Sequence, residues 1–249
     1  MEPLEVILVA LGVIAGATLQ SAMGFGFALV AGPAVFAVAE PAEAITILIT
    51  LGTVLNLLIM LAEQRPSEVL RPEVIRILAW AAPGVVAGLF ILLALSKPTL
   101  QVVVGISVIV AVVIQARNGL AEEKQGTPVA RAAAGLAAGT LTTTTATSGP
   151  PLVLYLQSIG ARPEPFRDTM AALLLGLNVM GAVALVVADN RAELPELAIL
   201  AVLVLAVAVG RPAGRILFDR FEHHSFRVAG LGLIVVSGIA SIAAGLAGG

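Results

Sequence analysis

Two polar clusters interrupt long apolar stretches of the chain, and their residue types suit anion binding. No charged side chain occurs from residue 6 to 39 or from 132 to 161, and glycine and proline break both stretches midway. Amide and hydroxyl groups, together with main-chain N–H groups freed at the breaks, can bind an anion without a buried lysine. The candidate substrate-binding residues at the breaks are Gln20, Ser21, Gly24, Phe25 and Gly26 in the first and Thr144, Thr145, Thr147, Ser148 and Gly149 in the second.

Each break also marks a place where a short helix would begin. Ser148 suits the N-cap position, and Pro150 falls in the first helical turn, where its missing N–H is no loss. Helices starting there and at Phe27 would direct unpaired N–H groups and the positive ends of their dipoles toward the breaks. For any single threonine, the alternative is a hydrogen bond to the backbone of its own helix.

The composition indicates that lipid is the solvent of this chain. Apolar residues make up 59% of it and charged residues 12%, and the mean hydropathy is +1.03. Soluble domains are typically about 45–50% apolar and about 25% charged. The net charge of −2 gives no sign of nucleic-acid binding, and the absence of cysteine excludes disulfides and thiolate metal sites. The sequence has no metal-ligand cluster, nucleophile–base set or phosphate loop, so we expect no enzyme, cofactor or metal.

The two uncharged stretches are too long to be single spanning helices. A helix of the 34 residues from 6 to 39 would be about 51 Å long, against roughly 30 Å of hydrocarbon. The pieces after the breaks, 27–39 and 151–160, are too short to span and have re-entrant length. Six further apolar runs predict full crossings at about 44–62, 74–96, 99–116, 169–188, 195–218 and 228–247.

The halves of the chain resemble each other. Two glycine pairs and one asparagine recur in the same order: Gly12 and Gly16 as Gly135 and Gly139, Asn56 as Asn178, and Gly84 and Gly88 as Gly210 and Gly214. The spacings are 123, 122 and 126 residues. We therefore predict a first membrane repeat at 1–118, a polar cytoplasmic connector at 119–128 and a second membrane repeat at 129–249.

The distribution of basic residues favours re-entrant hairpins over kinked spans. If each broken stretch crossed the membrane, the Lys and Arg residues would divide evenly between the two sides. If each stretch returns to its own side, only Lys97 and Arg191 lie on the sparse side. The predicted fold is an all-α polytopic membrane protein with two inverted repeats, each a re-entrant hairpin plus three transmembrane helices, giving about eight membrane segments. We expect a multi-pass membrane protein with both termini outside and the basic loops in the cytoplasm.

Three polar residues within the crossings complete the candidate site. Asn56 and Asn178 lie at corresponding places in the two halves and serve either to join helices or to brace the breaks. Arg211 lies roughly 10 Å inside its predicted helix end, where it either attracts an anion or extends its side chain to the interface.

The breaks resemble the repeat motifs of the sulfite exporter TauE/SafE family. The resemblance lies in Gly16–Pro33, in Thr145–Leu156 and in Gly210–Leu217, and it extends over the whole chain. It implies transport of small sulfur anions such as sulfite, sulfoacetate and other organosulfonates across the inner membrane. Many members have a denser glycine run where this chain has Phe25 and Phe27.

The sequence favours export over uptake. Because the cell interior is negative, expelling an anion is downhill by about 2.3 kcal/mol per charge per 100 mV. No Asp or Glu lies in the middle of a predicted crossing to bind a driving ion. We therefore expect a secondary transporter that works by alternating access between the two breaks, as a monomer or homodimer. The alternatives are an anion channel with the same site, or an uptake permease coupled to H⁺ or Na⁺.

Overall fold

The computed structural model describes residues 2–62, 67–100, 126–188 and 196–220, with single helical residues between 102 and 113 and between 235 and 246. All regular structure in these described parts is helical. The helices are α1 (Pro3–Met23), α2 (Phe27–Val38), α3 (Pro41–Ala62), α4 (Arg71–Ala94), α6 (Pro128–Thr145), α7 (Gly149–Ser158), α8 (Pro163–Val187) and α9 (Leu197–Arg220). Most of the predicted 119–128 connector and of the apolar runs at 99–116 and 228–247 lies outside the described residues.

The chain folds back on itself at each break, as the re-entrant prediction requires. In the first repeat α2 runs back along α1: a Cβ atom on Gly16 would lie 2.6 Å from the Phe27 carbonyl oxygen, and one on Gly12 would lie 3.2 Å from Ala34 Cβ. In the second repeat α7 runs back along α6, because Tyr155 Oη near the end of α7 accepts a hydrogen bond from Arg131 Nε near the start of α6, at 2.9 Å. Both broken segments are therefore helical hairpins.

The hairpins open toward opposite ends of the molecule. Glu40, just after α2, pairs with Lys97, just after α4, at 3.3 Å. At the other end of α3, Arg162 after α7 pairs with Glu68 at 3.4 Å. The 22 residues of α3 separate these two ends by about 33 Å. We call one end the Arg131 face; it holds residues 67–73, 126–131 and 158–168. We call the other end the Lys97 face; it holds Glu40 and Lys97.

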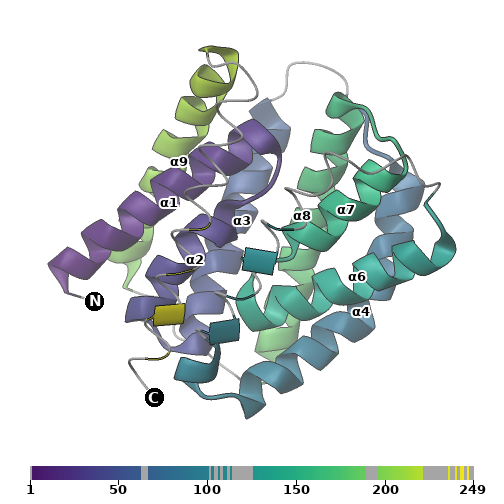
Figure 1. Cartoon of the computed structure of the whole chain (residues 1–249). Helices are drawn as coiled ribbons and strands as arrows, with labels where there is room; N and C mark the ends of the chain where they lie inside the picture. Colours follow the sequence, from purple (N-terminus) through teal and green to yellow (C-terminus); the bar gives the residue numbers. More distant parts are fainter. Residues whose placement is uncertain are drawn as a thin grey trace.

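The two repeats are interlocked through reciprocal helix contacts. The first helix of each repeat packs against the fourth helix of the other, so α1 lies along α9 and α6 lies along α4 (Figure 1). In both places glycines permit the close approach. Gly210 and Gly214 of α9 lie against the carbonyls of Ile14 and Thr18, while Gly84 and Gly88 of α4 lie against those of Leu136 and Thr140. This packing relates α1 to α6 by 122 residues, the spacing that also relates Asn56 to Asn178.

The predicted correspondence of Gly12 and Gly16 with Gly135 and Gly139 is wrong by one residue. Gly135 and Gly139 face α4, whereas Gly12 and Gly16 face α2. The two glycine pairs are 123 residues apart, whereas the helices correspond at 122. This difference of one residue turns Gly135 and Gly139 by about 100° around α6 from the positions that correspond to Gly12 and Gly16. The small residues were correctly recognised as packing sites, but they serve different neighbours.

The apolar surface is that of a polytopic membrane protein. Among the described residues, five helices (α1, α3, α4, α8 and the first 18 residues of α9) are long and apolar enough to cross a membrane. Large apolar side chains remain exposed along these helices, including Leu4, Leu61, Phe90 and Val187. Burying such side chains in lipid removes the cost that water would impose.

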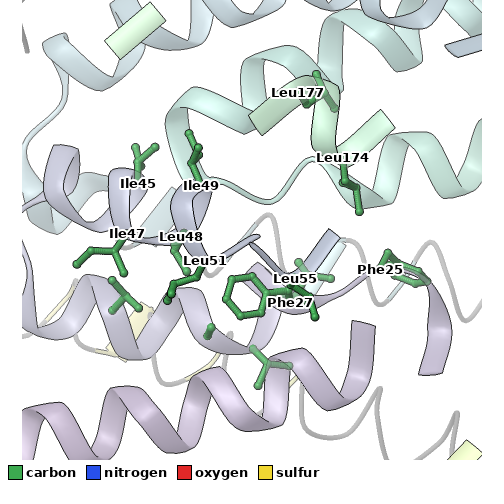
Figure 2. Close-up of a cluster of buried hydrophobic side chains, with 14 of the residues drawn as sticks. Phe25, Phe27, Ile45, Ile47, Leu48, Ile49, Leu51, Leu55, Leu174 and Leu177 are labelled. Atoms are coloured by element: carbon green, nitrogen blue, oxygen red, sulfur yellow. The ribbon is translucent and has the colours of Figure 1, made fainter. Parts of the chain in front are cut away.

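The centre of the molecule is a continuous apolar core in which α3 is packed from several sides. Phe27, at the start of α2, lies beside Leu51 and Leu55 of α3, whereas Phe25 stands apart from that group (Figure 2). Leu51 and Leu55 are fully buried. The start of α2 is thus held firmly at the middle of α3, and this placement fixes the first break relative to the rest of the fold.

Candidate functional site between the two breaks

The first break is a tight turn that depends on glycine. Helix α1 ends at Met23, and α2 begins at Phe27. Gly24 has φ 84° and Gly26 has φ 112°, both in the left-handed region that residues with a Cβ rarely adopt. Gly24 N donates to the Gln20 carbonyl at 2.7 Å and closes the last turn of α1. These two glycines let the chain reverse within three residues.

The second break has the same outline but different chemistry. Helix α6 ends at Thr145, and Ala146 ends it in the left-handed region with φ 56°, an uncommon conformation for alanine. Helix α7 begins at Gly149, so Ser148 occupies the predicted N-cap position. The Ser148 side chain, however, makes no capping hydrogen bond, because this residue has helical and not extended backbone angles. Its hydroxyl is left available for another partner.

The two breaks are in direct contact. A Cβ atom on Gly149 would lie 3.4 Å from Phe25 Cβ, which is ordinary van der Waals distance. Both residues are buried. The starts of α2 and α7, more than 120 residues apart in the chain, therefore meet inside the protein.

A small cavity lies where the two breaks meet the centres of α3 and α8. Its volume is about 30 Å³, which is roughly enough for two water molecules. Seven of the predicted site residues line it: Gln20, Gly26, Asn56, Thr147, Ser148, Gly149 and Asn178. The other lining residues are Phe27, Ala28, Leu29, Leu48, Gly52, Ala146 and Leu174. The α3 and α8 residues lie near the middle of their helices, so the cavity lies near mid-depth in the molecule.

Gln20 braces the first break. Its Nε2 donates to Asn56 Oδ1 at 2.9 Å, and its Oε1 accepts from Phe27 N at 3.1 Å. The side chain thus links the centre of α3 to the first N–H group of α2. Gln20 and Asn56 are both buried, so these bonds replace those that water would make. Of the two roles predicted for Asn56, the structure supports bracing.

Several donors at the cavity have no partner in the part of the chain that the structure describes. Ser148 is 3% exposed, and neither its hydroxyl nor the Asn178 amide makes a hydrogen bond to any described residue. The N–H groups of Ala28 and Leu29 in the first turn of α2, and of Gly149 in that of α7, are likewise unpaired within the described part of the chain. Pro150 and Pro151 have no N–H group, so the first turn of α7 offers fewer unpaired donors than that of α2.

The cavity is polar without being charged. None of the described residues that line it is Asp, Glu, Lys, Arg or His. The positive ends of the α2 and α7 dipoles border it, and the nearby donors are neutral. Such a site attracts an anion while sparing the protein the desolvation cost of a buried cation.

Most threonines of the second cluster bond to their own helix, as the alternative interpretation predicted. Thr144 Oγ1 donates to the Thr140 carbonyl at 2.8 Å, and Thr145 Oγ1 donates to the Leu141 carbonyl at 3.2 Å. The Thr145 hydroxyl also contacts that of Thr147 at 2.6 Å. Thr144 and Thr145 do not line the cavity, and Thr147 does.

Four other predicted site residues also lie outside the cavity lining. Ser21 faces α9, with its Cβ 2.9 Å from where a Cβ of Gly214 would be, and its buried hydroxyl has no partner among the described residues. Gly24 and Phe25 belong to the first break but contact the start of α8 and Gly149. Arg211 is half-buried on α9, beyond the cavity lining.

Sequence reasoning missed two groups of residues near the site. Gly52 and Leu174 line the cavity and precede Asn56 and Asn178 by four residues, a separation that puts both members of each pair on one face of a helix. This signal was available in the sequence. Arg167 packs on the first break and donates from its Nη2 atom to the Ser21 carbonyl at 3.2 Å. It belongs to the other repeat, so no local pattern pointed to it.

These features define a class of protein: a multi-pass membrane protein with two inverted repeats whose broken hairpins meet at mid-depth. A model of the family described as Sulfite exporter TauE/SafE matches residues 8–241. The chain therefore belongs to this family of membrane transport proteins, as its motifs predicted. No curated protein and no solved structure matches the chain.

Proposed function

We propose that the protein carries a small sulfur oxyanion across the membrane and binds it in the cavity between the two breaks. The observation that supports this most strongly is the convergence of unpaired donors there: the Ser148 hydroxyl, the Asn178 amide and the first N–H groups of α2 and α7. Oxyanions of sulfur present several acceptor oxygens to such a ring. The family membership is consistent with this substrate class.

The size of the cavity favours a compact anion. Room for roughly two water molecules suits sulfite, whereas sulfoacetate would require the breaks to separate further. We therefore rank sulfite above larger organosulfonates as the substrate bound in this conformation.

Alternating access is the mechanism that we favour. The two breaks contact each other beside the cavity, so movement of one hairpin relative to the other would change access to it. The inverted arrangement gives the two faces of the protein equivalent sets of helices, which permits equivalent inward-open and outward-open states. An anion channel, the alternative, would need a continuous pore.

Export is the proposed direction, with the Arg131 face in the cytoplasm. That face carries Arg71, Arg131, Arg162 and Arg167, while the opposite face carries Lys97. By the positive-inside rule this distribution supports an orientation in which the hairpin of α6 and α7 opens to the cytoplasm and the N-terminus lies outside. Among the described lining residues there is no acidic side chain to bind a driving ion, which favours export over uptake coupled to H⁺ or Na⁺.

Flux into liposomes tests the proposal. The purified protein would be given sulfite, sulfoacetate or acetate under an imposed membrane potential. We expect saturable, potential-driven flux of sulfite, slower flux of sulfoacetate and none of acetate. Equal flux of all three anions would contradict selectivity for sulfur oxyanions, and large single-channel currents would replace the carrier by a channel.

A further inference from the structure

The tip of the first hairpin is wedged between two helix starts. On one side Phe25 packs against Gly149 at the start of α7. On the other side Gly24 packs against α8: a Cβ on Gly24 would lie 3.5 Å from Arg167 Cγ and 3.8 Å from Phe166 Cε1. Gly26, one residue further along, already lines the cavity. The tip therefore stands between the cavity and the Arg131 face, where α8 begins.

Arg167 fastens this tip to α8. Its guanidinium donates to the Ser21 carbonyl at 3.2 Å, in the last turn of α1. Carbonyls of a last helical turn lack intrahelical donors, and the negative end of the helix dipole attracts a cation there. Arg167 comes from the second repeat and the carbonyl from the first, so the bond joins the two repeats beside the first break.

We propose that Arg167 is an anion-sensitive latch of the gate on the Arg131 face. An oxyanion arriving from that face replaces the Ser21 carbonyl as a partner of the guanidinium, and the freed tip of the first hairpin then swings away from α8 to open the cavity. This role deepens the proposed function, since the substrate of the cavity is also the ligand that opens it.

The chemistry favours this exchange. A guanidinium can bind an oxyanion with two parallel hydrogen bonds between opposite charges, whereas Arg167 makes one hydrogen bond to the uncharged Ser21 carbonyl, from its Nη2 atom. Arg167 is half-buried and lies within residues 158–168 of the Arg131 face. The neighbouring charged groups are Asp168, whose Oδ2 accepts from Glu68 N at 2.7 Å, and the Arg162–Glu68 pair. The hydrogen bond to the Glu68 amide helps to hold the Asp168 carboxylate in place.

The structural alternative is that Arg167 simply caps α1. A pure cap would stabilise the protein equally in the open and closed states and would not respond to anions. The two roles differ in whether the accessibility of the cavity from one face depends on Arg167 and on a dissolved anion.

The absence of cysteine from this chain makes that difference measurable. Ala28→Cys places one thiol at the cavity without touching a polar side chain. Reconstituted in liposomes, this variant is labelled with a membrane-impermeant thiol reagent from each side in turn. Arg167→Gln is then added to this variant as the test. Arg162→Gln is the matched control, because this substitution also removes one positive charge from the same segment but breaks only an exposed pair with Glu68.

We expect Arg167→Gln to speed labelling from the Arg131 face about tenfold, the effect of one lost charge-assisted hydrogen bond, and to leave labelling from the Lys97 face unchanged. Arg162→Gln should change neither rate. Equal rates in the two variants, or a change from both faces, would overturn the latch.

The response to an anion is tested in the same preparation. Methanesulfonate, which unlike sulfite does not attack thiol reagents, should speed labelling of Ala28→Cys from the Arg131 face and should have no further effect once Arg167→Gln is present. If methanesulfonate does not change the labelling rate of Ala28→Cys, with or without Arg167→Gln, the anion-triggered latch is refuted, whatever the flux assay gives. If sulfite flux fails while the methanesulfonate effect persists, the fault lies with the proposed transport and the latch stands.

Discussion

Gln20 and Asn56 are joined side chain to side chain at 2.9 Å, and through this bond the first break is tied to the centre of α3. The same Gln20 accepts the first N–H group of α2. One amide thus sets both the position of the break and the direction in which the next unpaired N–H groups, those of Ala28 and Leu29, are presented. The corresponding place in the second repeat is Thr142, which bonds to its own helix, so this brace exists in one repeat alone among the described residues.

Replacing Gln20 should damage both stability and transport. Gln20→Ala leaves the Phe27 N–H and the Asn56 carbonyl oxygen unpaired at buried positions, at a cost of about 1–3 kcal/mol. Thermal unfolding in detergent should show a lowered midpoint, and liposome flux should fall with it. Thr142→Ala, at the corresponding place, removes a bond that its helix can spare and serves as the control.

Replacing Ser148 should weaken binding and leave stability intact. Its hydroxyl has no partner among the described residues, so Ser148→Ala breaks no bond of the folded protein. Loss of one hydrogen bond to the anion should raise the half-saturating sulfite concentration about threefold to tenfold. Thr144→Ala, whose hydroxyl bonds to the Thr140 carbonyl outside the cavity, should leave that concentration unchanged. An unchanged affinity in Ser148→Ala would remove Ser148 from the site.

The glycines between the repeats should be intolerant of a methyl group. A Cβ on Gly88 would collide with the Thr140 carbonyl and with Thr143 Oγ1, so Gly88→Ala should lower stability by about 1–3 kcal/mol. Gly32, also buried in a helix, has Leu48 Cδ1 as its nearest neighbour at 3.8 Å. Gly32→Ala should therefore be neutral or stabilising, because alanine favours helix. Equal thermal midpoints for the two variants would contradict the reciprocal packing of α4 on α6.

The second hairpin should depend on a polar cluster at the Arg131 face. Glu73 on α4 accepts from Arg131 Nε at 2.7 Å and from Tyr155 Oη at 2.6 Å, and Arg131 Nε lies 2.9 Å from the same hydroxyl. Tyr155→Phe should destabilise the protein by about 1–2 kcal/mol, since the partners are largely shielded from water. Arg162→Gln breaks an exposed pair and should cost under about 1 kcal/mol. The thermal unfolding midpoints of the two variants measure these two losses of stability. A Tyr155→Phe protein as stable as the wild type would show that the cluster does not hold α7.

The breaks and their meeting were predictable because they depend on local rules. Glycine, proline and uncharged length define a broken membrane segment, and Asn56 and Asn178 repeat at the spacing that packing later confirmed. Which way a side chain points around its helix was harder, since one residue of offset turns it by about 100°. That is why Ser21 faces α9 and why Gly12 faces α2. Arg167 could not be found locally, because the contact joins residues 146 positions apart.

The position of the bound anion is the most direct test of the central claim. Selenite has nearly the shape of sulfite and scatters X-rays anomalously, so a crystal of the protein grown with it reports where the anion lies. We predict one strong anomalous peak within hydrogen-bond distance of the Ser148 hydroxyl and the Asn178 amide, bordered by the starts of α2 and α7. A peak elsewhere, or none in the cavity at a selenite concentration that saturates transport, would contradict an anion site between the two breaks.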